Sequence, residues 1–378
     1  MHILIAPNAF KNSATATAAT EAIQQGLQSS KLSCTTECFP IADGGDGTAE
    51  LIVNKCNGVW VDAVVSDPLG RPITSAFGLI DDGKTAVIEM ANASGLRLLK
   101  ADELVPMHTS SYGTGQLMKI ALDRGVNKII LAMGGSATVD GGCGILNALG
   151  INFLDAEGNT LTANPEGLQQ MAAIDTSGLD SRIANCEIVV VCDVDNKLLG
   201  DNGAAAVFGP QKGATAEQVK LLDGFLANFS AVTLEHTGKN IAEIKYGGAA
   251  GGATAGVHAY LNARLVNGIE YFLQLTGFDK ALQNADVVIT GEGSIDTQTL
   301  QGKGPFGVAA MAKQYGLPVI GIAGMVPLNG DPDLRKYFDV LLAIGNGPAD
   351  MPNAIKNTHA NLVRMGTEIG TMLAIPRK

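Results

Sequence analysis

The stretch from Asn127 to Gly150, NKIILAMGGSATVDGGCGILNALG, constrains the fold more than any other part of the sequence. Its apolar run, Ile129 to Ala132, is typical of a strand buried on both faces, and a glycine-rich turn leads from it into a helical pattern. This order directs backbone N–H groups and the positive end of a helix toward an anion. Two interpretations of the turn stay open: a phosphate cradle with hydroxyl donors, or a tight connection capped by Asp140.

Strand-like runs near the two ends of the chain differ from those in its middle. Ile3–Ala6, Asp286–Thr290, Pro318–Ala323 and Val340–Ile344 alternate with helical patterns, which favours a parallel sheet. Between Val59 and Met90, short strand-like runs are separated by turn signals, which is typical of antiparallel strands.

We therefore predict an α/β protein with two domains. A Rossmann-like parallel-sheet domain is expected to combine residues 1–60 and 285–378, and residues 61–284 are expected to form an inserted α/β domain with a mixed sheet. The glycine-rich stretch Gly247–Gly256 is expected to be a mobile loop or a second place where backbone closes on a ligand.

Composition excludes several classes of protein. With 46% hydrophobic and 17% charged residues, the 378-residue chain can bury a substantial core, and its net charge of −11 argues against a nucleic-acid partner. Neither a signal peptide nor a membrane-spanning apolar run is recognised. The six cysteines and five histidines show no metal-binding spacing, so we expect reduced thiols and a cytoplasmic location.

Five predicted strands end in polar turns, and ligands of parallel sheets bind outside the carboxyl ends of strands. These turns hold Asn8 and Lys11, Asp43 and Asp46, Ser136 and Asp140, Asp193 and Asn196, and Glu292 and Asp296. Carboxylates converging on one cleft would repel one another unless a cation such as Mg²⁺ intervened. Asp46 is also expected to cap the helix that follows it.

These parts are the ones that phosphoryl transfer requires: an anion-binding backbone, a lysine and a carboxylate that accepts a proton. Lys11, Lys212 and Lys303 lie in polar or glycine-containing turns, where a purely solvated role is less expected. The sequence has no P-loop, no G-x-G-x-x-G after the first strand and no G-x-S-x-G.

Motifs spread over nearly the whole chain resemble those of the type-1 glycerate kinase family. They are IAPNAFKNS, ADGGDGT, TAVIEMANASGL, TSSYGTG, GGSATVDGG, CDVDN, GDNGAAAVFGPQKGA, GAAGG and VITGEGSIDTQT followed by GK. The resemblance implies an ATP- and Mg²⁺-dependent phosphotransferase that acts on D-glycerate, with two α/β domains and the active site in the cleft between them. It implies 2-phosphoglycerate as the product, with 3-phosphoglycerate as the alternative.

The chain departs from the family pattern in a few positions. Asn8 and Ala9 stand where relatives usually have Asp and Ser, which removes a charge from the first turn. Ser294 stands where an Arg is usual, which removes a candidate phosphate clamp, and Val139 replaces a common Asn.

From the chemistry of these residues we assign expected roles. Asp193, or failing it Asp296, accepts the proton of the glycerate hydroxyl, while Lys11 and Lys303 offset phosphate charge. Asp43 and Asp140 lie near Mg²⁺. The expected substrate- and phosphate-binding residues are Asn8, Gly44, Gly45, Gly134, Gly135, Ser136, Thr138, Asn196, Lys212 and Glu292.

Three rival functions remain alongside this hypothesis. They are a kinase of another small hydroxy acid, a non-catalytic sensor of glycerate or nucleotide, and, last, a nicotinamide oxidoreductase. Small molecules are the expected partners, with neither nucleic acid nor a membrane involved, and the sequence leaves the oligomeric state open.

Overall fold

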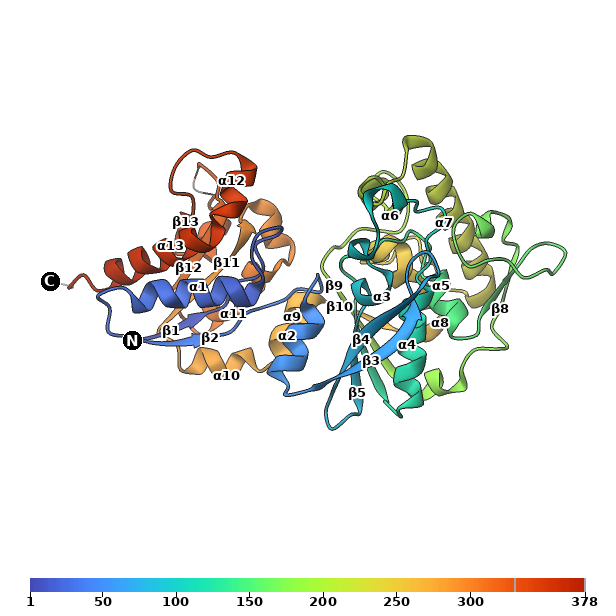
Figure 1. The fold of residues 1–378 in the computed structure, drawn as a ribbon, viewed down its shortest axis with the longest axis horizontal. Coiled ribbons are helices and arrows are strands. Elements are labelled where there is room, and N and C mark those ends of the chain that lie inside the picture. The colour runs from blue at the N-terminus through green and yellow to red at the C-terminus, as the bar shows by residue number, and fades with distance from the viewer. Residues whose placement is uncertain (330, 377–378) are drawn as a thin grey trace. The chain divides into compact units, whose positions relative to one another are not determined.

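The computed structural model describes residues 1–329 and 331–376 and divides the chain into two compact units (Figure 1). Unit 1 contains residues 1–43 and 267–378, and unit 2 contains residues 44–266. Both boundaries lie earlier in the chain than the predicted domain boundaries after residues 60 and 284. As a result, the helix at 48–55 belongs to unit 2, and the two helices between 268 and 283 belong to unit 1.

Unit 1 is built on a five-stranded parallel sheet with the order β13-β12-β11-β1-β2. Its strands are β1 (His2–Ile5), β2 (Thr35–Cys38), β11 (Val287–Ser294), β12 (Val319–Met325) and β13 (Val340–Ala343). The predicted parallel sheet formed by both ends of the chain is therefore confirmed.

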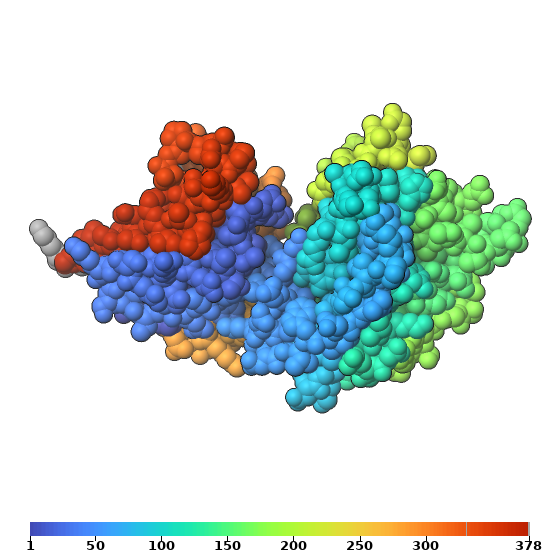
Figure 2. Space-filling view, viewed as in Figure 1, coloured from blue at the N-terminus to red at the C-terminus, as the bar shows by residue number. Residues whose placement is uncertain are grey.

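The helices of unit 1 connect and cover these strands. They are α1 (Ala16–Gln28), α9 (Gly268–Leu275), α10 (Phe278–Gln283), α11 (Gly304–Gln314), α12 (Met351–Lys356) and α13 (Thr358–Leu373), with short 3₁₀ turns η7 (Thr297–Gln301) and η8 (Leu334–Lys336). Helices α1 and α13 pack closely at Gly26. A Cβ atom at this position would lie only 2.1 Å from the Val363 carbonyl oxygen, so the close approach depends on glycine. In Figure 2 the blue N-terminal and red C-terminal segments form one continuous surface of this unit.

Unit 2 contains a six-stranded mixed sheet with the order β10-β9-β6-β5-β4-β3. Its strands are β3 (Val59–Ser66), β4 (Pro72–Ile80), β5 (Thr85–Glu89), β6 (Lys128–Ala132), β9 (Glu187–Cys192) and β10 (Arg264–Asn267). The first three pair antiparallel and β5-β6-β9 pair parallel, so the predicted antiparallel strands and mixed sheet are confirmed.

The sheet of unit 2 is accompanied by helices that share its hydrophobic core. They are α2 (Thr48–Lys55), α3 (Ala91–Ser94), α4 (Tyr112–Asp123), α5 (Cys143–Ala148), α6 (Ala204–Phe208), α7 (Ala216–Thr237) and α8 (Ala253–Leu261), with 3₁₀ turns η1 (Leu96–Leu98), η2 (Ala101–Glu103), η3 (Gly167–Gln170), η4 (Ser181–Asn185), η5 (Pro210–Lys212) and η6 (Ala249–Gly252). A small hairpin joins β7 (Asn152–Leu154) to β8 (Ala173–Asp175). Among the described residues, none of the helices combines the length and apolar character that crossing a membrane requires.

Candidate functional site

The loops that follow β1, β2 and β11 in unit 1 bring six of the predicted site residues together. The Asn8 side-chain amide donates to Asp43 Oδ2 at 2.8 Å, and the Asn8 backbone N–H donates to the Gly291 carbonyl oxygen, also at 2.8 Å. Glu292 follows Gly291 on β11, and its ionisation responds to four further predicted residues: Asp43, Lys303, Lys11 and Asp296. The neutral Asn8 therefore acts as a donor to a carboxylate at this turn.

Glu292 is the most unusual side chain of this group. Only 9% of it is exposed, and its Oε1 atom is buried without a hydrogen-bond partner among the described residues. Burial, followed by the negative charge of Asp43, raises the pKa of Glu292 to about 7, while Lys303 and Lys11 act in the opposite direction. The carboxyl group can therefore gain or lose a proton near neutral pH.

Asp296 and Lys303 both lie at the start of helical turns in unit 1. Asp296 Oδ1 accepts from the Gln298 N–H at 2.8 Å, and its Oδ2 accepts from the Ser294 hydroxyl at 3.3 Å, so the carboxylate caps η7. Lys303 is the N-cap residue of α11, and its carbonyl oxygen accepts from two N–H groups of that helix. Both oxygens of Asp296 therefore have a donor, and Oδ1 is the one that caps η7.

In unit 2, the predicted glycine-rich turns pack against one another. The Gly134 N–H donates to the Gly44 carbonyl oxygen at 3.0 Å, and a Cβ atom on Gly134 would lie 2.5 Å from the Gly45 Cα atom. Gly135 has φ +70°, and a Cβ atom there would lie 2.0 Å from Asp46 Oδ1. The need for close backbone packing accounts for these glycines, and their predicted contact with phosphate stays a prediction.

Lys212 lies beneath the turn that follows β6. Only 2% of the residue is exposed, and its ammonium group donates to Ser136 Oγ at 2.8 Å and to the Thr138 carbonyl oxygen at 2.7 Å. Burial lowers the pKa of Lys212 to about 7, and Asp140 partly opposes this change. Thr138 Oγ1 is buried and has no hydrogen-bond partner among the described residues. The turn is thus stabilised by two hydrogen bonds from a buried lysine whose pKa lies near neutral pH.

Asp140 is fully buried and joins two helix starts. Its Oδ2 atom accepts from the Ser111 N–H and hydroxyl, both at 2.7 Å, and from the Gly144 N–H at 3.2 Å, while Oδ1 accepts from the Gly142 N–H at 3.1 Å. These four bonds connect the start of α4 to the start of α5. They favour the capping interpretation of Asp140 over the predicted position beside a metal ion.

Asp193 and Asn196 lie after β9. Asp193 is half-buried. The pKa of the Cys192 thiol is raised mainly by burial of the thiol and, second, by the negative charge of Asp193. The Asn196 side-chain amide donates to the Asn202 carbonyl oxygen at 2.8 Å, which closes the loop between them. The Asn196 carbonyl oxygen also accepts from the Gly248 N–H at 2.8 Å.

The stretch Gly247–Gly256 closes on the protein's own backbone. The Gly251 carbonyl oxygen accepts from the Gly141 N–H at 3.1 Å, and a Cβ atom on Gly251, which has φ +66°, would lie 2.0 Å from the Thr138 carbonyl oxygen. One expectation was that this stretch closes on a ligand. In the structure, the turn formed by residues 138–141 packs against Gly251.

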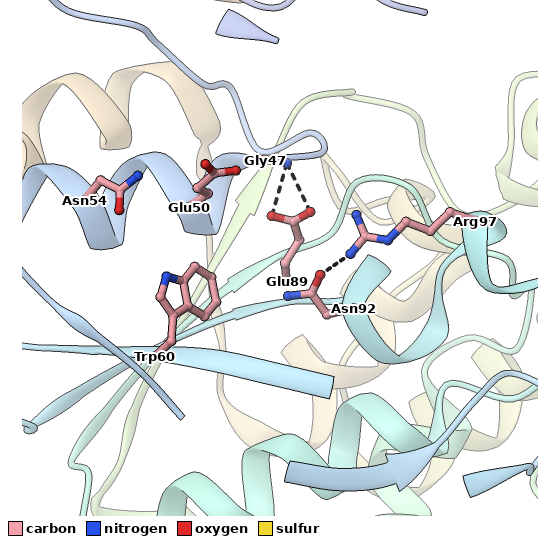
Figure 3. A pocket seen from close by; sticks show the side chains of 7 residues that line it. All are labelled: Gly47, Glu50, Asn54, Trp60, Glu89, Asn92 and Arg97. Atoms are coloured by element: carbon pink, nitrogen blue, oxygen red, sulfur yellow. Dashed lines mark hydrogen bonds between the residues drawn. The ribbon is translucent and has the colours of Figure 1, made fainter. Parts of the chain in front are cut away.

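Sequence reasoning missed a polar cavity of about 320 Å³ in unit 2 (Figure 3). It is lined by Gly47, Glu50, Asn54, Trp60, Glu89, Asn92 and Arg97, none of which was predicted as a site residue. Two signals could have indicated it: Trp60 is the sole tryptophan and is 43% exposed, and Glu89 is a further acidic residue at a strand end.

Glu89 also corrects the prediction for the start of α2. Its carboxylate accepts from the Gly47 N–H at 3.0 and 3.2 Å and from the Ala49 N–H at 3.2 Å, so Glu89, rather than Asp46, satisfies this helix start. The sequence suggested Asp46 because it lies nearby in the chain, whereas Glu89 reaches the helix from the end of β5.

A divalent cation such as Mg²⁺ needs several oxygen ligands gathered in one place. Among residues 1–329 and 331–376, no group of three or more His, Cys, Asp or Glu side chains is arranged to hold a metal ion. Asp140 already accepts four hydrogen bonds, and Asp43 accepts one from Asn8.

Comparisons with known proteins cover nearly the whole chain. The sequence model of the Glycerate kinase family matches residues 3–374. The chain is 42% identical over 377 residues to "Glycerate kinase" of Bacillus subtilis (strain 168), covering 100% of this chain and 99% of the relative. It is 40% identical over 379 residues to "Glycerate 2-kinase" of Escherichia coli (strain K12), covering 99% and 98%. The crystal structure of putative glycerate kinase 2 from Salmonella typhimurium LT2 superposes with a TM-score of 0.83 at 41% identity and covers 99% of this chain and 98% of that chain.

Proposed function

Because the chain belongs to the glycerate kinase family, we propose that it transfers the γ-phosphoryl group of ATP to a hydroxyl group of D-glycerate. The enzyme is then a phosphotransferase with an alcohol group as acceptor. The observation that carries the proposal is the family match over residues 3–374, together with relatives that share about two fifths of their residues with this chain over their whole length.

We propose 2-phosphoglycerate as the product, which fits the name of the Escherichia coli relative, "Glycerate 2-kinase". Phosphorus NMR of the product formed from ATP and D-glycerate tests activity, substrate and position together, because the 2- and 3-phosphates give different proton couplings. A 3-phosphate signal would overturn the position alone. If no product or ADP forms, the kinase proposal fails and the binding-sensor alternative gains support.

In unit 1, Lys11 and Lys303 are proposed to offset the charge of the transferring phosphoryl group. Both lysines act electrostatically on the buried Glu292, so their positive charges lie near the same polar cluster. Phosphoryl transfer depends mainly on positioning and on such charge stabilisation.

In unit 2, the Ser136 hydroxyl is proposed to donate to a phosphate oxygen. The Lys212 ammonium donates into Ser136 Oγ, which leaves the hydroxyl hydrogen of Ser136 to bind an acceptor elsewhere. The Gly134 N–H is already donated to Gly44, so it contributes to the shape of the turn.

Magnesium is proposed as the counter-ion of the ATP phosphates, since kinases bind Mg²⁺ largely through substrate phosphate oxygens. We assign it no protein ligand, because Asp140 is saturated with protein donors and Asp43 is bonded to Asn8.

The proton of the glycerate hydroxyl needs an acceptor, and the sequence nominated Asp193 and, failing it, Asp296. Both oxygens of Asp296 have protein donors, with Oδ1 capping η7 and Oδ2 accepting from Ser294, which weakens its candidacy. If Asp193 is the acceptor, Asp193→Asn lowers kcat by orders of magnitude and leaves the fold intact. Retained turnover in the folded variant would remove Asp193 from the mechanism.

A kinase of another small hydroxy acid is the second candidate, because Asn8 and Ser294 change the polar cluster of unit 1 relative to the family pattern. Asn8 bonds to Asp43, and Ser294 bonds to Asp296. A panel of small hydroxy acids in an ADP-coupled assay distinguishes the two candidates by kcat/KM. We also propose a cytoplasmic location, which the six free cysteine thiols support.

A further inference from the structure

Glu292 occupies a central position in the sheet of unit 1. It lies near the end of β11, paired with Ala323 of β12, and just beyond the level where β1 ends on the other side. Thr290, two residues earlier and on the same face, donates its hydroxyl to the Ala6 carbonyl oxygen and is fully buried. Glu292 is therefore held on a rigid strand at the edge where parallel sheets bind their ligands.

The other buried carboxylates of this protein have the donors that burial demands. Glu89 accepts from two backbone N–H groups, and Asp140 accepts four hydrogen bonds. Asp67, 3% exposed, accepts from the Leu69 and Arg71 N–H groups and from the Arg71 guanidinium. Glu292 Oε1 differs, because no described residue donates to it. Leaving a buried acceptor unpaired is costly, so it points to a partner that binds from outside the chain.

Charged groups on the loops after β1, β2 and β11 act on Glu292. Asp43 after β2 and Asp296 after β11 make the carboxylate harder to form, while Lys11 after β1 and Lys303 at the start of α11 make it easier. Together with burial, they hold the pKa of Glu292 at about 7, which suits a group that exchanges a proton at neutral pH.

We propose that Glu292 is the catalytic residue that receives the proton of the substrate hydroxyl. The inference rests on the proposed kinase function. The hydroxyl donates a hydrogen bond to Oε1; as its oxygen forms the new bond to the γ-phosphorus of ATP, the bond from that phosphorus to the ADP oxygen breaks. The hydroxyl proton passes to Glu292 and leaves to solvent after the product departs. Phosphate ester, ADP and one proton account for all atoms and charges.

The decisive experiment compares Glu292→Gln with the wild-type enzyme by steady-state kinetics between pH 5.5 and pH 9. Glutamine keeps the size of the side chain and cannot take the proton. We expect kcat to fall at least about 100-fold and the acidic limb of the pH–rate profile, centred near pH 7 in the wild type, to disappear. Glu292→Asp keeps a carboxylate and is expected to retain part of the rate together with an acidic limb.

Glu89→Gln is the matched control, because it makes the same change at another buried strand end and is expected to keep the acidic limb. A folded Glu292→Gln enzyme with kcat within about threefold of the wild type would overturn the inference, as would an acidic limb that persists in it but vanishes in Asp193→Asn. A wild-type enzyme that forms no ADP with D-glycerate would instead overturn the proposed function on which the inference rests.

Discussion

Glu292 in unit 1 and Asp140 in unit 2 are both acidic residues in polar turns or strand ends, and the sequence treats them alike. The structure separates them: Asp140 accepts four hydrogen bonds, whereas Glu292 Oε1 has no partner among the described residues. One carboxylate completes the structure of its own unit, and the other is left for a partner. Acidic residues in similar sequence contexts can thus differ in role, one stabilising the fold and the other being available to bind a ligand.

A second pair extends the comparison. Burial moves the pKa of both Glu292 and Lys212 to about 7 from opposite sides. Lys212 has two short hydrogen bonds to the turn after β6, so its altered pKa accompanies a structural role. A shifted pKa by itself therefore does not distinguish a structural group from a catalytic one. The two groups differ in that Lys212 has hydrogen-bond partners, whereas Glu292 Oε1 has none among the described residues.

The largest expected effect is that of Asp140→Ala. Removing the carboxylate leaves buried N–H groups at the starts of α4 and α5 without an acceptor, so we expect unit 2 to lose about 4 kcal/mol of stability. Urea unfolding followed by circular dichroism measures the change. A loss below about 1 kcal/mol would mean that Asp140 is less important to the structure than its bonds suggest, and would revive its role as a ligand.

Lys212→Met should change the pH dependence of stability by about 3 kcal/mol between pH 7 and pH 9.5. The pKa of Lys212 is about 7 in the native state, well below its value in the unfolded chain. The contribution of Lys212 to the free energy of unfolding is therefore full above the unfolded-state pKa and is lost as the pH falls toward 7. The stability advantage of the wild type over the variant is expected to shrink as the pH falls. Parallel curves for the two proteins would contradict the buried, bonded position of Lys212.

Gly251→Ala tests whether the glycine-rich stretches of unit 2 serve packing. The new Cβ atom would meet the Thr138 carbonyl oxygen at 2.0 Å, and the backbone has φ +66°, so we expect a loss of about 3 kcal/mol. Gly158→Ala is the control, because Gly158 has φ +83° with open space around it and should lose only about 1 kcal/mol. Equal losses in the two variants would show that backbone conformation alone requires Gly251.

Glu292→Gln is expected to increase stability by about 2 kcal/mol at pH 8 and by little at pH 5. The pKa of Glu292 is about 7 in the native state, which is above its value in the unfolded chain. The contribution of wild-type Glu292 to the free energy of unfolding is therefore full below the unfolded-state pKa and is lost as the pH rises through 7. Thermal unfolding at the two pH values measures the difference. A variant less stable than the wild type at pH 8 would indicate that Glu292 is a structural carboxylate like Asp140.

Several features of the fold followed from local patterns. The apolar runs at both ends of the chain predicted one parallel sheet, and the turn signals between Val59 and Met90 predicted the antiparallel strands, because periodicity and turn chemistry are local properties. The sequence motifs also indicated the family to which the chain belongs.

Hydrogen-bond partners from distant segments could not be predicted in this way. Glu89 was not expected to reach the start of α2, nor was Lys212 expected beneath the turn after β6, because each pairing joins residues more than forty positions apart. The expected cleft between the domains and the roles of the individual site residues stay predictions.

By itself, the sequence determined the class of fold, the polar strand ends and the family, since these depend on residue type and order along the chain. Only the tertiary structure decided which acidic side chains have their hydrogen bonds completed and which do not. The physical reason is that burial and hydrogen-bond satisfaction depend on the segments that packing brings alongside a residue. The unpaired Glu292 oxygen and the fully bonded Asp140 differ in those neighbours.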